Sequence, residues 1–417
     1  MQRQILFAIL AAVALGTSAC EQFVTVTRVL PEVYDPGQAD QDLASATNAL
    51  VTMDAPDDIV CPVGFTRSGG IGTLSLAAPN NNVVDTDTEL NQVFNASGHM
   101  KVVQEINRCG VTNVNIFGCA GSTFIVEDLR DNNNGSSQFA SMGPLVAHEY
   151  GHTKGLPHRA VNNSNFVMNA SIGPNSLRVS SAECMAYQAG SSPIQPAVPD
   201  LGEAEAAGAG PVSIQEFVRR FYPDTMPFAE AAQFGPEVVP ALLTMLADSD
   251  ERLHWPMIAS VIGIVGGPER ADDLIAFIER PRIGRLSRQE YDGVRAAIVA
   301  LGYLVEGTGS TRALDYLMSA SDPGAWNRKA GMRGWQMPRG GSWGERNQRL
   351  AVHAVMGLGL SGHPEAKLAL EQWRTRLERR NGVGSAAQQT SMLGVVQQAL
   401  DDQRQVSRAG LALYYSR

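Results

Sequence analysis

The stretch from His148 to His158, HEYGHTKGLPH, constrains this chain more than any other. It fits the pattern H-E-x-x-H-x-x-G-x-x-H without substitution. Side chains four residues apart lie on one face of a helix, so His148 and His152 can offer ring nitrogens to the same metal ion. Glycine adopts backbone angles that other residues resist, so we expect Gly155 to end the helix. The chain can then turn back and deliver His158 as a third ligand.

Glu149 follows the first candidate ligand directly and can reach a metal-bound water without binding the metal itself. Three protein ligands with one open position are typical of a catalytic zinc ion rather than a closed structural one. The stretch from Ser141 to Ala147 supplies the apolar lead-in of a buried helix. Two histidines at this spacing could be ordinary helix residues, but the added glycine and third histidine favour the metal interpretation.

The full motif resembles that of the metzincin clan of zinc peptidases. The clan's second hallmark is a methionine turn behind the third histidine, and Met168 stands at that place. The alternative interpretation of Met168 is an ordinary core residue. Some families of the clan carry a tyrosine ligand two residues later, where this chain has Ala170. The resemblance covers the chain from Ile59 to Gln188.

The resemblance implies an α+β catalytic domain with one catalytic zinc ion, held by His148, His152 and His158. It also implies that Glu149 acts as the general base toward a zinc-bound water that attacks a peptide bond.

The N-terminus resembles a bacterial export signal. Residues 1–19 combine Arg3, an apolar run from Ile5 to Leu15 and a small-residue cleavage region. This apolar run is too short to cross a bilayer, and no later stretch reaches the required length. Cys20 resembles the lipid-modified cysteine of bacterial lipoproteins, although Thr17 stands where that family favours leucine. We expect an exported protein, either a cell-envelope lipoprotein that meets the membrane only through an anchor at Cys20 or a secreted protein.

The remaining cysteines are even in number: Cys61, Cys109, Cys119 and Cys184. In an exported protein they predict two disulfides, with three possible pairings. Cys109 and Cys119 bracket one short apolar segment, so a local bridge between them is our first expectation. Cys109 also lies in a segment that resembles the cysteine switch of matrix-type metzincins. Its position shortly before the metal helix, where the catalytic fold has already begun, favours a disulfide or a buried thiol instead.

Composition and periodicity divide the chain behind the export signal. We expect an exposed lead-in over 20–58, the metzincin-like domain over 59–189, a linker rich in proline, alanine and glycine over 190–212, and an all-α domain over 213–417.

Within the metzincin-like domain, spacing predicts several elements. These are strands over 73–76, 111–117 and 122–126, a helix over 90–108, and a helix through Gln188 opened by a capping box at Ser180. The resemblance to metzincins implies that the strand before the asparagine-rich loop at 131–135 forms a sheet edge, where an extended peptide can pair.

The C-terminal region is similar to HEAT repeats. Three segments, 259–277, 297–317 and 352–370, each combine an apolar helix, a glycine-marked end and a second helix. Gly263 and Gly302 are 39 residues apart, close to the HEAT period, and a non-repeating helical bundle is the alternative.

An insertion over 321–348 holds Trp326, Trp335 and Trp343 among several arginines. It is either a binding loop or a long loop whose tryptophans pack against the helices.

These features lead to one functional hypothesis and one rival. The hypothesis is a zinc metalloendopeptidase that acts on protein or peptide substrates, with a further protein partner on the repeats. The rival is a surface-anchored helical-repeat binding protein whose zinc module is vestigial or structural. Glu149 favours the enzyme, because a structural site has no use for that carboxylate. A zinc hydrolase of another bond type stays open. The net charge of −9 argues against a nucleic-acid partner.

Overall fold

The computed structural model describes residues 20–51, 61, 63–76, 82–129, 142–159, 166–173, 176–188, 212–332, 334–338, 341–380 and 386–416. The expected export signal, the asparagine-rich loop and nearly all of the expected linker lie outside the described residues, as does the side chain of Cys20.

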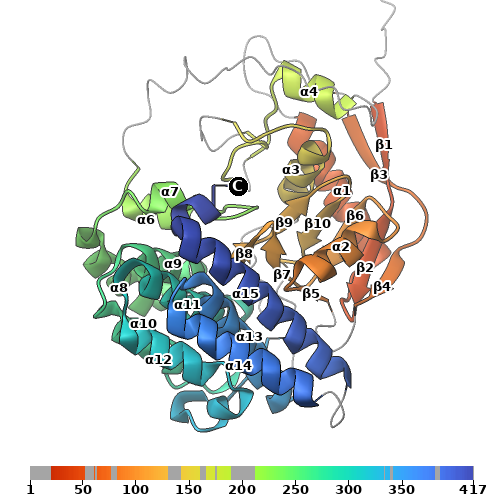
Figure 1. Cartoon of the computed structure of the whole chain (residues 1–417). Coiled ribbons are helices and arrows are strands. Elements are labelled where there is room, and N and C mark those ends of the chain that lie inside the picture. The colour runs from red at the N-terminus through yellow and green to blue at the C-terminus, as the bar shows by residue number, and fades with distance from the viewer. Residues whose placement is uncertain are drawn as a thin grey trace, which may run out of the picture.

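The structure is a mixed α+β protein whose C-terminal half is helical (Figure 1). The N-terminal half contains β1 (Cys20–Val24), β2 (Val26–Leu30), α1 (Pro36–Val51), β3 (Val63–Arg67), β4 (Gly72–Ser75), β5 (Val83–Val84), α2 (Asp87–Asn95), β6 (Met100–Val103), β7 (Glu105–Cys109), β8 (Val111–Ile116), β9 (Gly118–Ala120), β10 (Phe124–Glu127), α3 (Gly143–Thr153) and α4 (Ser181–Gln188).

The C-terminal half contains α6 (Ile214–Arg219), α7 (Phe228–Ala231), α8 (Val239–Ala247), α9 (Trp255–Val265), α10 (Arg270–Glu279), β11 (Gly284–Arg285), α11 (Arg288–Thr308), α12 (Thr311–Ala320), β12 (Trp335–Gln336), α13 (Trp343–Leu360), α14 (Pro364–Arg380) and α15 (Ala386–Tyr414). Short 3-10 turns cover Pro236–Val238, Ser249–Glu251, Pro323–Asn327 and Ala330–Met332.

A five-stranded sheet with the order β4-β2-β6-β10-β9 forms the centre of the N-terminal half. The first four strands are parallel, and β9 runs antiparallel to β10 at one edge. The strand before the asparagine-rich loop, β10, is therefore internal, and the prediction that it forms the edge is wrong. The reason is the tight hairpin before β10, which folds β9 back onto its outer side.

Two further predictions fail in this half. The predicted helix over 90–108 ends at Asn95, because Gly98 has a φ of +99° and the β-branched residues that follow pair as β6 and β7. The predicted exposed lead-in contains β2, which lies between β4 and β6 with Val26 and Val29 buried. In the same segment, α1 packs against the metal-motif helix α3.

Other local predictions agree with the structure. The backbone N–H of Ser180 donates to the Glu183 carboxylate (2.6 Å), and the Glu183 N–H donates to the Ser180 hydroxyl (3.2 Å), which is the expected capping box. Cys109 pairs with Cys119 across ten residues of sequence, and the second disulfide joins Cys61 to Cys184 in α4. A paired Cys109 has no free thiol to act as a cysteine switch.

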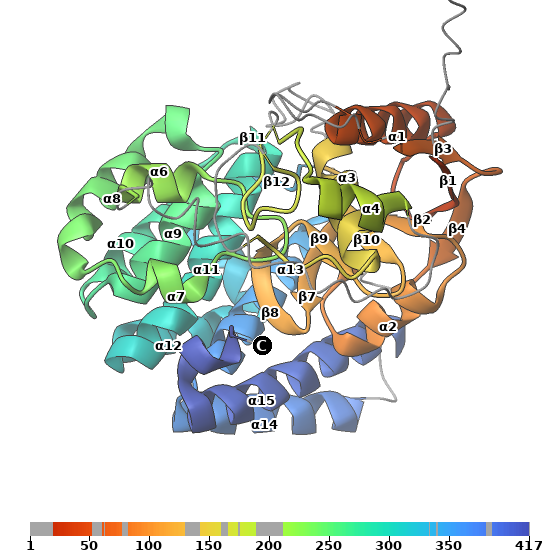
Figure 2. The same ribbon diagram turned by 90° about the horizontal axis from the view of Figure 1, so that it is seen from above.

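The helices of the C-terminal half pack in succession. α9 packs against α11, α11 against α13 and α13 against α15, while α10 and α14 each pack against α12 (Figure 2). In the insertion, Trp326 and Trp335 are fully buried, and Trp343 is 48% exposed. Within the described residues, no helix is both long enough and apolar enough to span a bilayer.

The two halves meet through a buried group of charges. The carboxylate of Glu105 in β7 accepts from Arg349 of α13 (2.6 Å) and lies 3.2 Å from Nη1 of Arg295 in α11. Nε2 of His353 also lies 3.2 Å from this carboxylate. Burial alone would raise the pKa of Glu105, but Arg349 and Arg295 hold it well below its ordinary value.

Replacing Glu105 with glutamine should lower the free energy of unfolding at pH 7 by about 3 kcal/mol, because the buried Arg349 and Arg295 each lose one of their carboxylate partners. The native pKa is depressed, so the stabilisation is complete above the ordinary glutamate pKa of about 4.3 and is lost as the pH falls through the native value. Urea denaturation at pH 7 and at pH 3 should therefore show a smaller deficit at pH 3. The exposed Glu237→Gln serves as the control, and an equal deficit at both pH values would contradict the assignment.

Candidate metal centre

Helix α3 positions the first half of the motif. Its residues from Gly143 to Gly151 are buried, and Pro144 occupies its first turn, where no backbone donor is lost. The helix ends as the sequence predicts: Gly155 has a φ of +80°, and its N–H donates to the His152 carbonyl (2.9 Å). The chain then turns back toward the helix.

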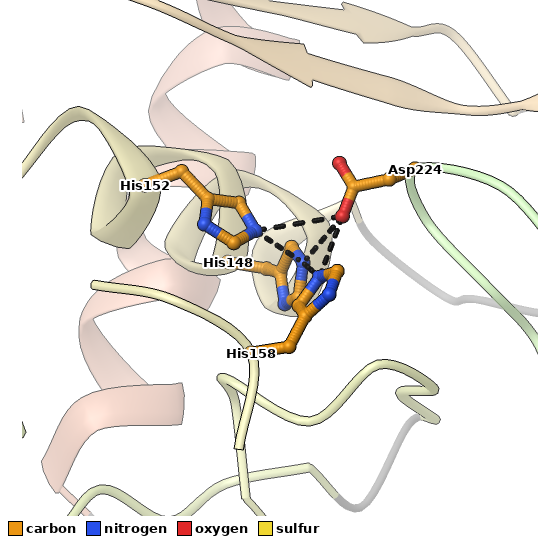
Figure 3. Close-up of side chains that lie close together, drawn as sticks. All are labelled: His148, His152, His158 and Asp224. Atoms are coloured by element: carbon orange, nitrogen blue, oxygen red, sulfur yellow. Dashed lines mark hydrogen bonds and ion pairs between the residues drawn. The ribbon is translucent and has the colours of Figure 1, made fainter. Parts of the chain in front are cut away.

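The three histidine side chains converge on one point (Figure 3). Nε2 of His148 lies 3.0 Å from Nε2 of His152 and 3.3 Å from Nε2 of His158. A fourth candidate metal-ligand atom, Oδ2 of Asp224, lies 2.6 Å from Nε2 of His158. The same oxygen lies 3.4 Å from Nε2 of His148 and 3.4 Å from Nε2 of His152. Together these four residues form a group that could hold a metal ion.

The donor set fits zinc. Zinc–nitrogen bonds of about 2.0–2.1 Å put neighbouring ligands of a tetrahedron about 3.3 Å apart. Apart from the shorter His158–Asp224 contact, the four donor separations given above lie between 3.0 and 3.4 Å. Imidazole nitrogen and carboxylate oxygen are also donor types that zinc prefers.

Backbone carbonyls fix two of the imidazole rings. Nδ1 of His148 donates to the carbonyl of Val167 (2.6 Å), and Nδ1 of His152 donates to the carbonyl of Leu156 (2.7 Å). A carbonyl only accepts, so each Nδ1 carries the proton and each neutral ring presents an unprotonated Nε2 to the site.

Met168 lies in the turn that supplies the Val167 carbonyl. It is fully buried, and its sulfur lies 3.2 Å from the hydroxyl of Tyr187, which also donates to the Ala147 carbonyl (2.9 Å). A Cβ at Gly151 would come within 2.4 Å of that sulfur. Met168 therefore packs directly against the metal-motif helix, beside the residue that precedes His152.

Glu149 is buried, and neither of its carboxylate oxygens accepts a hydrogen bond from the residues that the structure describes. Its carboxylate lies against Gly118 of the edge strand β9, where a Cβ would come within 1.9 Å of Oε1. Burial raises the pKa of Glu149 well above its ordinary value, and the negative charge of Asp224 raises it further.

The protonation states of the histidines and of Asp224 depend on one another. Burial lowers the pKa of His148, which favours the neutral ring that a metal requires. Burial acts in the same direction on His152, but Asp224 outweighs it and raises that pKa. Burial would raise the pKa of Asp224, yet its contacts with the three histidines hold it well below its ordinary value. Asp224 therefore stays ionised.

The structure thus brings together the sequence-predicted His148, His152, His158 and Glu149, and it adds Asp224. Asp224 follows the expected linker and belongs to no recognised spacing pattern, so nothing in the sequence pointed to it. Gly118 likewise could not be identified from the sequence, because its place in the site comes only from the Glu149 side chain that packs against it.

Comparisons with protein-family models, with curated proteins and with solved structures give no match for this chain.

Replacing His158 with alanine should weaken zinc binding by more than about 100-fold, because loss of a direct ligand exceeds the about 10–100-fold cost of losing an outer-shell partner. Competition with a chromophoric chelator on the purified protein measures this change. His363→Ala, outside the motif, should bind zinc as the wild type does. Wild-type affinity in His158→Ala would rule out the three-histidine assignment.

Proposed function

We propose that this protein is an exported zinc-dependent endopeptidase. The observation that carries the proposal is the buried carboxylate of Glu149, which accepts no hydrogen bond from the described residues and lies on the same helix as His148 and His152. An unpartnered buried carboxylate is costly to the fold, and it is most readily explained by a function.

The sheet supports the proposal. An antiparallel edge strand, β9, lies directly before the internal strand β10 and packs against α3. An extended peptide could pair with that edge next to the metal centre. We therefore interpret the N-terminal half as a metzincin-like catalytic domain.

The chemistry follows from the residues present. Zinc held by His148, His152 and His158 would supply a Lewis acid that makes a water molecule more acidic and polarises a peptide carbonyl. Glu149 would accept the proton of the attacking water and then donate it to the leaving amine.

The second half supports a docking role. The helix pairs α9–α10, α11–α12 and α13–α14 follow the order expected of HEAT-like repeats, which bind proteins along their surfaces. The two disulfides support export, because such bonds persist in oxidising compartments. A lipid anchor at Cys20 belongs to the same proposal.

A structural metal site is the second candidate, and Asp224 is the observation that favours it. Four protein ligands close a site, as in structural zinc centres. The surface-anchored binding protein would then use its helices alone. This candidate leaves the buried Glu149 unexplained.

Replacing Glu149 with glutamine should preserve zinc binding and lower the rate of hydrolysis of an unfolded protein by about 10²–10⁴-fold, the usual contribution of a positioned base. The rates should be measured with and without a zinc chelator, in the wild-type chain and in a chain that carries Asp224→Ala. No chelator-sensitive hydrolysis in either chain would refute the peptidase, as would a rate unaffected by Glu149→Gln.

Gly118→Ala should also lower kcat while leaving zinc content unchanged, since the three atoms nearest to the new Cβ all belong to the Glu149 side chain, which it would displace. Gly121→Ala is the matched control, because its Cβ would meet only the Phe94 ring at an ordinary 3.7 Å. Equal kcat in the two variants would mean that the position of the Glu149 carboxylate is not critical.

A further inference from the structure

The segment from Phe221 to Thr225 reaches the metal centre from the C-terminal half. Contacts at both of its ends hold it against the N-terminal half. The Phe221 carbonyl accepts from the N–H of Ile172 (2.9 Å), and its ring stacks on Phe117 with centroids 4.7 Å apart. The hydroxyl of Thr225 accepts from the side-chain amide of Asn113 (2.6 Å).

Between these contacts, the backbone of the segment accepts hydrogen bonds from backbone N–H groups at the start of the edge strand β9. The carbonyl of Pro223 accepts from the N–H of Phe117 (2.7 Å) and from the N–H of Gly118 (3.1 Å). Gly118 begins β9 and packs against Glu149. A peptide pairing with this edge would need the same backbone donors.

The next residue fills the remaining metal position. A single oxygen of Asp224 faces all three histidine nitrogens (Figure 3). This leaves no open position for a water molecule at a tetrahedral ion. One short segment therefore covers both features that a peptidase needs, the strand edge and the fourth ligand position.

We propose that the segment Phe221–Thr225 is an internal inhibitor, in which Asp224 acts as a displaceable fourth ligand and Pro223 occupies the place of a substrate backbone. The inference rests on the proposed peptidase function and describes its regulation. The full chain is latent, and a peptide gains access only when this segment withdraws.

The contacts indicate a displaceable ligand rather than a permanent one. The Asp224 side chain is 25% exposed and that of His158 is 35% exposed, so the site opens to solvent on this side. Asp224 lies in an irregular segment, outside any helix or strand.

The test measures ligand access as well as activity. Acetohydroxamate, a small metal-chelating ligand, is titrated into the full-length zinc protein and into its Co²⁺-substituted form, where visible absorption reports the ligand set. Asp224→Ala should bind acetohydroxamate at least about tenfold more tightly, because acetohydroxamate no longer competes with the Asp224 carboxylate for the fourth metal position. It should also change the Co²⁺ spectrum and raise the rate of peptide hydrolysis. The exposed Asp315→Ala is the control and should match the wild type in all three measurements.

Thr225→Val provides an independent variant, since it removes the bond from Asn113 and loosens the segment without altering Asp224. It should shift acetohydroxamate affinity in the same direction by a smaller factor. The inference is overturned if both variants bind acetohydroxamate as the wild type does, or if Asp224→Ala loses zinc and gains no affinity, which would make Asp224 a permanent structural ligand.

The outcomes also separate the two proposals. Tighter acetohydroxamate binding in Asp224→Ala without any hydrolysis would support the internal ligand and refute the peptidase. Full hydrolysis by the wild type, with unchanged acetohydroxamate affinity in the variants, would support the peptidase and refute the inhibition.

Discussion

The candidate metal centre depends on two hydrogen bonds between imidazole Nδ1 atoms and backbone carbonyls. They orient His148 and His152 so that the opposite nitrogens face one point. The acceptors, Val167 and Leu156, lie beyond the helix, so the folding of the chain behind α3 decides the orientation of rings within it. Met168 and Tyr187 pack against the same helix and hold the chain behind α3 in place.

The helical half is joined to this centre by more than a covalent connection. Glu105 and Arg349 pair across the boundary, and Arg108 of β7 reaches Asp402 of α15 (3.0 Å). Val111 and Val114 of β8 belong to the same hydrophobic core as the helices. These contacts place Asp224 within reach of His158. In the proposed mechanism, these contacts provide the base from which the segment Phe221–Thr225 reaches the histidines.

Much of the candidate site follows from local spacing. The interval of four residues puts His148 and His152 on one helix face, and Gly155 ends the helix because its φ is positive. The capping box at Ser180 and the bridge between Cys109 and Cys119 are likewise contacts between residues close in the sequence. The prediction of a helix over 90–108 failed because β6 pairs with the distant strands β2 and β10. The segment after Gly98 has helix-like spacing, yet it forms β6 in one sheet and β7 in another.

By itself, the sequence determined that three imidazoles and a carboxylate could gather around a metal, because these residues share one helix and the turn behind it. Only the tertiary structure decided what surrounds them. It made β9 the sheet edge, packed Glu149 against Gly118 and brought Asp224 to the fourth position. The physical reason is that spacing along a helix repeats over a few residues. Contacts between remote segments depend on how whole elements bury their apolar faces and pair their backbones.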